Sequence, residues 1–153
     1  MSRTNEWLIE RASNALDIAD NGWAVFPCRG KRPITRHGFK DASVDYDDIM
    51  DWWMSDPDAN VGVAIPDGVI VVDVDDMDAF ADSGLDLPEA PGQNTPSGGL
   101  HRFYRLEAET PLQSVKKFPG VDTRVGGRGY VIAWDASAFS NTELPPAPAW
   151  VYR

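Results

Sequence analysis

The chain has 153 residues, a formal net charge of −10 and 42% hydrophobic residues. This length leaves room for a sizeable core, and the composition excludes a disordered chain. No apolar run approaches the roughly 20 residues of a membrane span, and the first residues lack the apolar stretch of a signal peptide. The single cysteine, Cys28, excludes an internal disulfide and a multi-cysteine zinc site. We therefore expect an intracellular protein without a membrane partner.

Acidic and basic residues are segregated along the chain. Residues 41–100 contain fifteen Asp and Glu and no Lys or Arg. Basic residues lie on both sides of this block, namely Arg29, Lys31, Arg32, Arg36 and Lys40 before it and Arg102, Arg105, Lys116, Lys117, Arg124 and Arg128 after it. A net negative charge normally argues against nucleic acid, because that affinity comes from Lys and Arg contacts with phosphate. The two basic groups keep such a partner open, with solvated surface as the alternative for each.

The spacing of apolar residues predicts three helices. The first runs from Trp7 to Ala19 and stops near Gly22. A second extends from the capping residue Asp45 through about Ser55, because acidic residues in the first turn favour the helix dipole. Met77–Ser83 is expected to form a third, short helix.

Apolar runs bounded by turn formers predict strands at Trp23–Pro27, Leu100–Leu106 and Tyr130–Trp134. Two further runs, Val61–Ile65 and Val69–Val74, flank a Pro-Asp-Gly turn signal, so we expect them to form a hairpin. The Pro-rich tail after Asn141 is expected to be a domain exit or linker.

Two aspartates, Asp73 and Asp75, follow the apolar run 69–72 directly. In an extended strand they point to the same face, roughly 6.6–7 Å apart, while Val72 and Val74 point into the core. Carboxylates at the end of a buried strand are costly without a positive partner, and a divalent cation is the usual one. The pattern predicts a metal-holding platform.

An Asp-x-Asp pair also occurs in other proteins. An EF-hand loop is excluded, because its sixth and twelfth positions require Gly and Glu and are Asp78 and Gly84 here. A haloacid-dehalogenase-type phosphatase also places Asp-x-Asp after an apolar strand, as nucleophile and acid. That class usually has the motif near the chain start and Thr or Val where Met77 stands, and it stays open as an alternative.

A glycine-rich segment, Thr95-Pro-Ser-Gly-Gly99, precedes His101. Two glycines let backbone N–H groups approach an anion, and a serine adds a hydroxyl donor. Ser97, Gly98, Gly99 and His101 therefore form a candidate triphosphate site. The alternative is a hairpin turn with a surface histidine.

Asp122 is a candidate third metal ligand. Two-metal phosphoryl transfer needs ligands on both ions, and two aspartates on one strand leave one side open. On its own, Asp122 also fits a turn residue or a salt-bridge partner of Arg124.

Together and in this order, these segments resemble the archaeo-eukaryotic primase superfamily, in particular the bifunctional DNA primase/polymerase (prim-pol) N-terminal domains of plasmids, phages and integrated elements. The resemblance runs from about Ala15 to about Pro148. It matches Asp73 and Asp75 to the first metal motif, His101 to the nucleotide-contacting motif and Asp122 to the third, metal-binding motif. Further matching segments are Gly22-Trp-Ala-Val-Phe-Pro27, Gly30-Lys-Arg-Pro33, His37-Gly-Phe-Lys-Asp-Ala42 and Asn60-Val-Gly-Val63.

The resemblance implies an α+β fold, with an RNA-recognition-motif (RRM)-like catalytic core and a small packed α/β element in residues 1–144, before the exit or linker at 145–153. It implies template-directed nucleotidyl transfer by a DNA primase/polymerase, with Asp73, Asp75 and Asp122 holding Mg²⁺ or Mn²⁺. The implied partners are a single-stranded DNA template and primer, NTP or dNTP, and a replicative helicase in trans or fused downstream. The implied setting is the cytoplasm of a bacterial or phage-infected cell.

Basic residues complete the expected site. Lys31, in the matching Gly-Lys-Arg-Pro segment, is a candidate for template or triphosphate contacts, together with Arg32 and Lys40. Arg124 and Arg128 are candidates for the nucleotide side. Two other functional classes stay open: a metal-dependent phosphohydrolase or nucleotide-sugar enzyme that uses Asp73 and Asp75, and a catalytically inactive prim-pol-like binding module.

Overall fold

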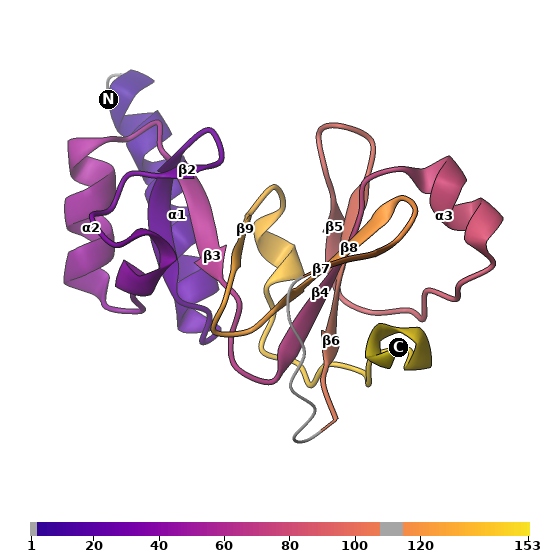
Figure 1. Ribbon diagram of the computed structural model, residues 1–153. Helices are drawn as coiled ribbons and strands as arrows, with labels where there is room; N and C mark the ends of the chain where they lie inside the picture. The colour runs from indigo at the N-terminus through magenta and orange to yellow at the C-terminus, as the bar shows by residue number, and fades with distance from the viewer. Residues whose placement is uncertain (1–2, 108–114) are drawn as a thin grey trace. The chain divides into compact units, whose positions relative to one another are not determined.

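The computed structural model describes the backbone of residues 3–107 and 115–153 and the side chains of residues 10–107 and 118–153. The chain divides into two compact units, each built on one antiparallel sheet (Figure 1). Unit 1 comprises Met1–Ala64 and Tyr130–Asn141, and unit 2 comprises Ile65–Gly129 and Thr142–Arg153. This mixture of helices and antiparallel strands is the α+β composition expected from the sequence.

Unit 1 contains a four-stranded sheet with the order β2-β1-β3-β9, two α-helices and two short 3₁₀ helices. Its elements are α1 (Arg3–Asp20), β1 (Val25–Arg29), β2 (Arg32–Pro33), η1 (Gly38–Asp41), α2 (Tyr46–Ser55), β3 (Asn60–Ala64), β9 (Tyr130–Ile132) and η2 (Ala136–Ala138). Among the residues that the structure describes, no helix combines the length and apolar character that a membrane crossing requires.

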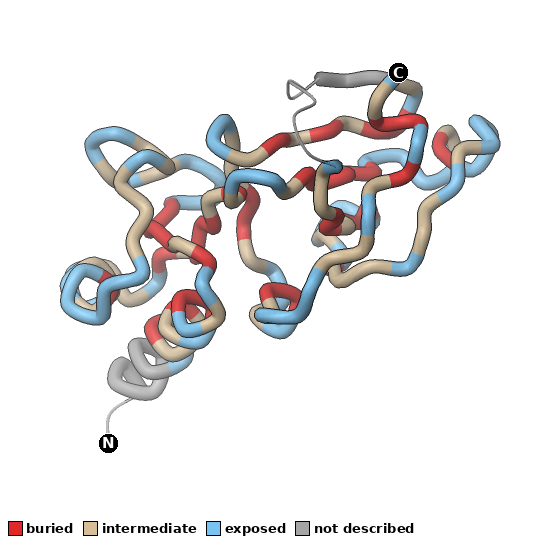
Figure 2. Tube along the Cα trace, turned by 90° about the horizontal axis from the view of Figure 1, so that it is seen from below, coloured by how far each residue is buried: buried red, intermediate tan, exposed pale blue. Residues whose placement is uncertain are grey.

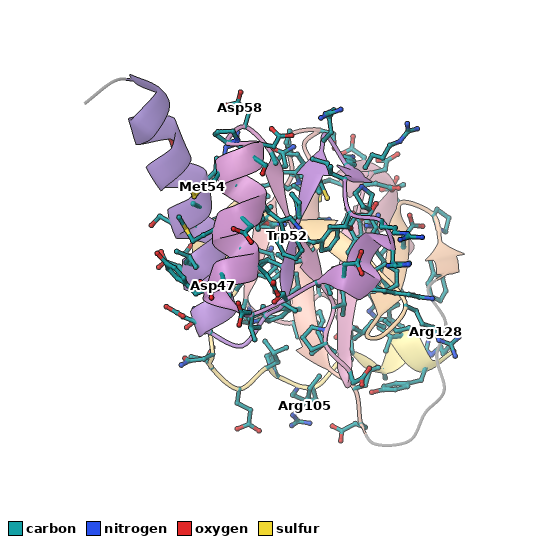
Figure 3. All side chains as sticks on the ribbon, turned by 90° about the vertical axis from the view of Figure 1, so that its left-hand side faces the viewer. Asp47, Trp52, Met54, Asp58, Arg105 and Arg128 are labelled. Carbon is teal, nitrogen blue, oxygen red and sulfur yellow. The ribbon has the colours of Figure 1, made fainter. Side chains whose placement is uncertain are left out.

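The sequence rules for helix ends are obeyed in α2. The side chain of Asp45 accepts hydrogen bonds from the backbone N–H groups of the two acidic residues of the first turn, as expected for a cap. Trp53 is fully buried and its indole nitrogen donates to the carbonyl of Ala59 at 3.0 Å. Met54, by contrast, is a residue of α2 (labelled in Figure 3) whose side chain is 64% exposed. The helix is therefore held by one apolar stripe.

The expected hairpin between the runs 61–65 and 69–74 is wrong. β3 pairs with β1 and β9 in the sheet of unit 1, whereas β4 (Val69–Val74) is the central strand of the other sheet. The segment between them makes a turn in which the N–H of Val69 donates to the carbonyl of Pro66. Both runs are buried, so their apolar character was read correctly, but it does not select the strand with which each pairs.

Unit 2 contains a five-stranded sheet with the order β5-β6-β4-β8-β7. Its elements besides β4 are α3 (Met77–Ser83), β5 (Gly92–Asn94), β6 (Leu100–Arg105), β7 (Val115–Phe118), β8 (Val121–Val125) and the 3₁₀ helix η3 (Ala149–Tyr152). One face of β4 presents Ile70, Val72 and Val74 to an apolar cluster, as the alternation predicted. Buried residues are concentrated along the strands of both units (Figure 2).

The Pro-rich tail is part of unit 2. The N–H of Arg105 at the end of β6 donates to the carbonyl of Pro145 at 2.9 Å, and the N–H of Ala147 donates back to Arg105. Trp150 is 2% exposed, packs against Phe80 and Phe118, and donates from its indole nitrogen to the carbonyl of Asp86. The sequence suggested an exit or linker because prolines dominate it, but the aromatic residues that follow the prolines anchor the segment in the core.

Candidate active site

Three residues singled out in the sequence lie on three adjacent strands of the unit 2 sheet. Register pairs Asp73 of β4 with His101 of β6 on one side and with Asp122 of β8 on the other. Directly opposite residues of antiparallel strands project from the same face, with Cα atoms roughly 4.5–5.5 Å apart. His101, Asp73 and Asp122 therefore form one line across the sheet, which we call the central row. It lies on the face opposite to the apolar cluster.

The Asp73 carboxylate is 87% buried and has cationic or donor groups on both oxygens. Its Oδ2 accepts a hydrogen bond from Nη2 of Arg124 at 3.0 Å, and its Oδ1 lies 3.6 Å from Nε2 of His101. Arg124 reaches Asp73 because it follows Asp122 by two positions on β8 and so projects from the same face. A guanidinium thus offsets the cost of placing this carboxylate in the sheet.

The carboxylate of Asp122 is in a less favourable environment. Its Oδ1 is buried and accepts no hydrogen bond from the residues that the structure describes. It also faces Asp73 from the neighbouring strand, an arrangement that places two negative charges side by side. A buried acceptor left without a donor costs about 1–3 kcal/mol. A cation bound at the row would remove this cost.

The donor chemistry of the row suits a hard divalent cation, since Mg²⁺ and Mn²⁺ prefer carboxylate oxygens. Asp75, the expected partner of Asp73, is exposed and follows the last residue of β4, where its N–H donates to the carbonyl of Gly120. Within the described parts of the chain, no group of three or more His, Cys, Asp or Glu side chains is gathered closely enough to hold a metal. Asp73 and Asp122 are opposite residues of adjacent strands, and Asp75 lies at the same end of β4.

The glycine-rich loop joins β5 to β6 and lies at that end of the sheet. A Cβ atom on Gly99 would lie 2.2 Å from the carbonyl oxygen of Val74, so only glycine allows the loop to approach β4 this closely. The N–H groups of Gly98 and Gly99 donate within the loop, to the carbonyl and to the hydroxyl of Thr95, each at 3.1 Å. The hydroxyls of Thr95 and Ser97 are 3.3 Å apart. A phosphate would therefore have to compete with Thr95 for these two amides.

The family model for bifunctional DNA primase/polymerase, N-terminal (Prim-Pol), matches residues 15–150. The chain belongs to this prim-pol family. The match includes both units and every residue of the central row, so the resemblance stated from the sequence is confirmed. Membership implies binding of DNA and nucleotides. A comparison with curated proteins finds no match.

The basic residues expected to serve the prim-pol site lie in different places. Lys31, Arg32 and Lys40 are exposed residues of unit 1, and the carbonyl of Lys31 accepts a hydrogen bond from the Tyr130 hydroxyl at 2.8 Å. Arg128 is an exposed residue of the turn that follows β8. Asp122 lies near the start of β8, so the strand separates the two residues. Of the cations named from the sequence, Arg124 is the one that contacts the central row in the described residues.

One buried polar residue beside the central row was missed. Gln93 of β5 is 3% exposed, pairs in register with His101, and places its amide nitrogen 3.0 Å from Nδ1 of that ring. The three-residue strand β5 contains Gly, Gln and Asn and gives no apolar signal. A usable signal existed, however. A hairpin centred on Ser97 places Gln93 opposite His101, because both lie four positions from the centre.

Proposed function

We propose that this prim-pol domain catalyses template-directed nucleotidyl transfer in the replication of a phage, plasmid or integrated element. A primer or initiating 3′-hydroxyl attacks the α-phosphate of an incoming NTP or dNTP, and pyrophosphate leaves. The observation that carries the proposal is the central row, in which two carboxylates and a histidine from three adjacent strands share one register. The motifs were far apart in the sequence, and the sheet brings them together.

Asp73 and Asp122 would hold Mg²⁺ or Mn²⁺, with Asp75 completing the ligand set. When bound, two such ions would polarise the attacking hydroxyl and stabilise the negative charge on the departing phosphates. Three carboxylates and two divalent ions leave a local charge of about +1, which attracts a nucleotide to an otherwise acidic protein. The buried Oδ1 of Asp122, which accepts no hydrogen bond from any residue whose side chain is described, supports this assignment.

Arg124 and His101 would contact the triphosphate. A guanidinium is well suited to phosphate oxygens, and Arg124 already lies beside the Asp73 carboxylate. His101 would donate from Nε2, the nitrogen that faces Asp73. Ser97 would add its hydroxyl, and the amides of Gly98 and Gly99 would exchange Thr95 for phosphate.

The sheet of unit 2 supports an RRM-like core. Strand β4 is followed by helix α3 and by the antiparallel pair β5 and β6, and β8 returns beside β4. The four strands stand in the order second, third, first and last along the sheet, which is the strand order of a β-α-β-β-α-β unit. Among the described residues, strand β7 lies between β6 and β8 along the chain, where that unit has its second helix. Unit 1 would be the α/β element that accompanies this core, although it is as long as unit 2 and not small as the sequence suggested. Its exposed Lys31, Arg32 and Lys40 would contact template phosphates, with Arg128 on the nucleotide side. A replicative helicase in trans or fused downstream would supply single-stranded template.

Primer extension and de novo priming on single-stranded DNA test the proposal, with Mg²⁺ compared with Mn²⁺ and NTP with dNTP. Asp73→Ala and Asp122→Ala should lower incorporation by about 10²-fold or more, because each removes a charge that acts in the transition state. Asp58→Ala, at an exposed position of unit 1, is the matched control (Figure 3). Full incorporation by folded Asp73→Ala would refute the assignment. Metal-dependent release of phosphate from a phosphomonoester without template would favour the phosphohydrolase instead.

A further inference from the structure

Gln93 is a nearly fully buried polar side chain next to the central row. It extends the row by one strand, because it pairs with His101, which pairs with Asp73. Its amide nitrogen lies 3.0 Å from Nδ1 of His101, and the opposite ring nitrogen, Nε2, lies 3.6 Å from Oδ1 of Asp73. The imidazole thus stands between an amide and a carboxylate.

The chemistry of these neighbours selects one form of the ring. An amide NH₂ group can only donate, so the Nδ1 atom that it faces acts as acceptor and has no proton. A neutral imidazole then has its proton on Nε2. A carboxylate oxygen can only accept, and Asp73 faces that same Nε2. Two groups on opposite sides of the ring therefore favour the same tautomer.

We infer that Gln93 is a positioning residue, which holds Nδ1 of His101 as an acceptor and so directs the Nε2–H donor into the site. The role rests on the proposed function, in which that N–H binds the triphosphate. Without the amide, Nδ1 would lose the donor that keeps it unprotonated. This role accounts for a buried glutamine in a short strand at the edge of the sheet.

The chain favours a direct spectroscopic test, because it contains two histidines. The other one, His37, is exposed in unit 1, and His37→Gln leaves His101 as the single imidazole in the spectrum. Long-range ¹H–¹⁵N correlation then reports which ring nitrogen of His101 has a proton. We expect an unprotonated Nδ1 and a protonated Nε2 in this background.

Two substitutions of Gln93 separate its role from simple packing. Gln93→Glu replaces the donor by an acceptor of the same shape, so Nδ1 should acquire a proton. Gln93→Met keeps the volume but has no donor, so it should raise KM for the nucleotide by about 3- to 10-fold, the loss of one neutral hydrogen bond, with a smaller change in kcat. Far-UV circular dichroism establishes that each variant is folded.

The outcomes are distinguishable. A protonated Nδ1 in the His37→Gln protein, or an unprotonated Nδ1 in folded His37→Gln/Gln93→Glu, would overturn the inference. So would an unchanged KM in folded Gln93→Met. If the domain incorporates no nucleotide at all, the proposed function fails, but the spectrum still decides whether Gln93 donates to Nδ1.

Discussion

Asp122→Asn should stabilise the metal-free protein while abolishing its activity. In the structure, Asp122 lies directly opposite Asp73, and its buried Oδ1 accepts no hydrogen bond from the described residues. Like charges on directly opposite residues cost about 0.2–1 kcal/mol, and a buried acceptor without a donor costs about 1–3 kcal/mol. Asparagine removes the charge and offers an N–H group toward Asp73. We expect a net gain of about 1 kcal/mol, since the new amide will not satisfy every polar atom.

Urea unfolding with EDTA, and again with excess Mg²⁺ or Mn²⁺, measures this gain. A ligand that binds only the folded state at 100 times its Kd adds about 2.7 kcal/mol to the free energy of unfolding. The wild-type protein should gain such an increment from the metal, whereas Asp122→Asn should gain much less. The order of stability of the two proteins should therefore reverse when metal is added.

Two results would contradict this reasoning. If Asp122→Asn is less stable than wild type in EDTA, the carboxylate is not a source of strain in the sheet. If metal stabilises both proteins equally, Asp122 is not a ligand. Asp58→Asn, the same change at an exposed position of unit 1, controls for the loss of one negative charge from an acidic protein.

Three further predictions concern packing. Burial raises the pKa of the Cys28 thiol to about 12. At pH 8 a thiol reagent should therefore modify Cys28 at least about 10³-fold more slowly in the native protein than in urea. Rapid labelling of the native protein would contradict the burial of this thiol. Gly99→Ala should lower the free energy of unfolding by about 1–3 kcal/mol, because its Cβ would overlap the carbonyl of Val74. Ser97→Ala, the control in the same loop, should not lower it. Equal urea midpoints for Gly99→Ala and the wild-type protein would refute the close approach of the loop to β4. Trp150→Ala should cost about 3–5 kcal/mol by the same measurement, and a cost below about 1 kcal/mol would mean that the tail is not part of the core.

The apolar strands could be predicted because a buried strand is made of apolar residues, which are visible in the sequence. The first four residues of β4 are aliphatic, and the alternation correctly predicted that Val72 and Val74 face the core. Strands β2, β5, β7 and β8 were not predicted. β5 contains Gly, Gln and Asn and so gives no hydrophobic periodicity, whereas β8 alternates buried and half-buried residues and its period-2 signal went unused.

The candidate site was predictable as a set of motifs but not as an arrangement. Asp73, His101 and Asp122 were named from the chemistry of their segments and from the family resemblance, and the sheet brings them into one register. Gln93 was not named, because its importance follows from pairing with His101 and not from its neighbours in the sequence. Arg124 was expected on the nucleotide, and its ion pair with Asp73 depends on the same unpredicted strand, β8.

Unit 1 is not continuous in the sequence, and this affects how the protein can be synthesised. After β3 the chain builds nearly all of unit 2 before β9 returns to pair with β3. A ribosome adds about 5–20 residues per second, so one edge of β3 lacks its partner for several seconds on each nascent chain. An unpaired, largely apolar edge is a template for association with other chains. Slow translation or a bound chaperone during this interval should therefore govern the yield of active protein more than the stability of the finished fold does.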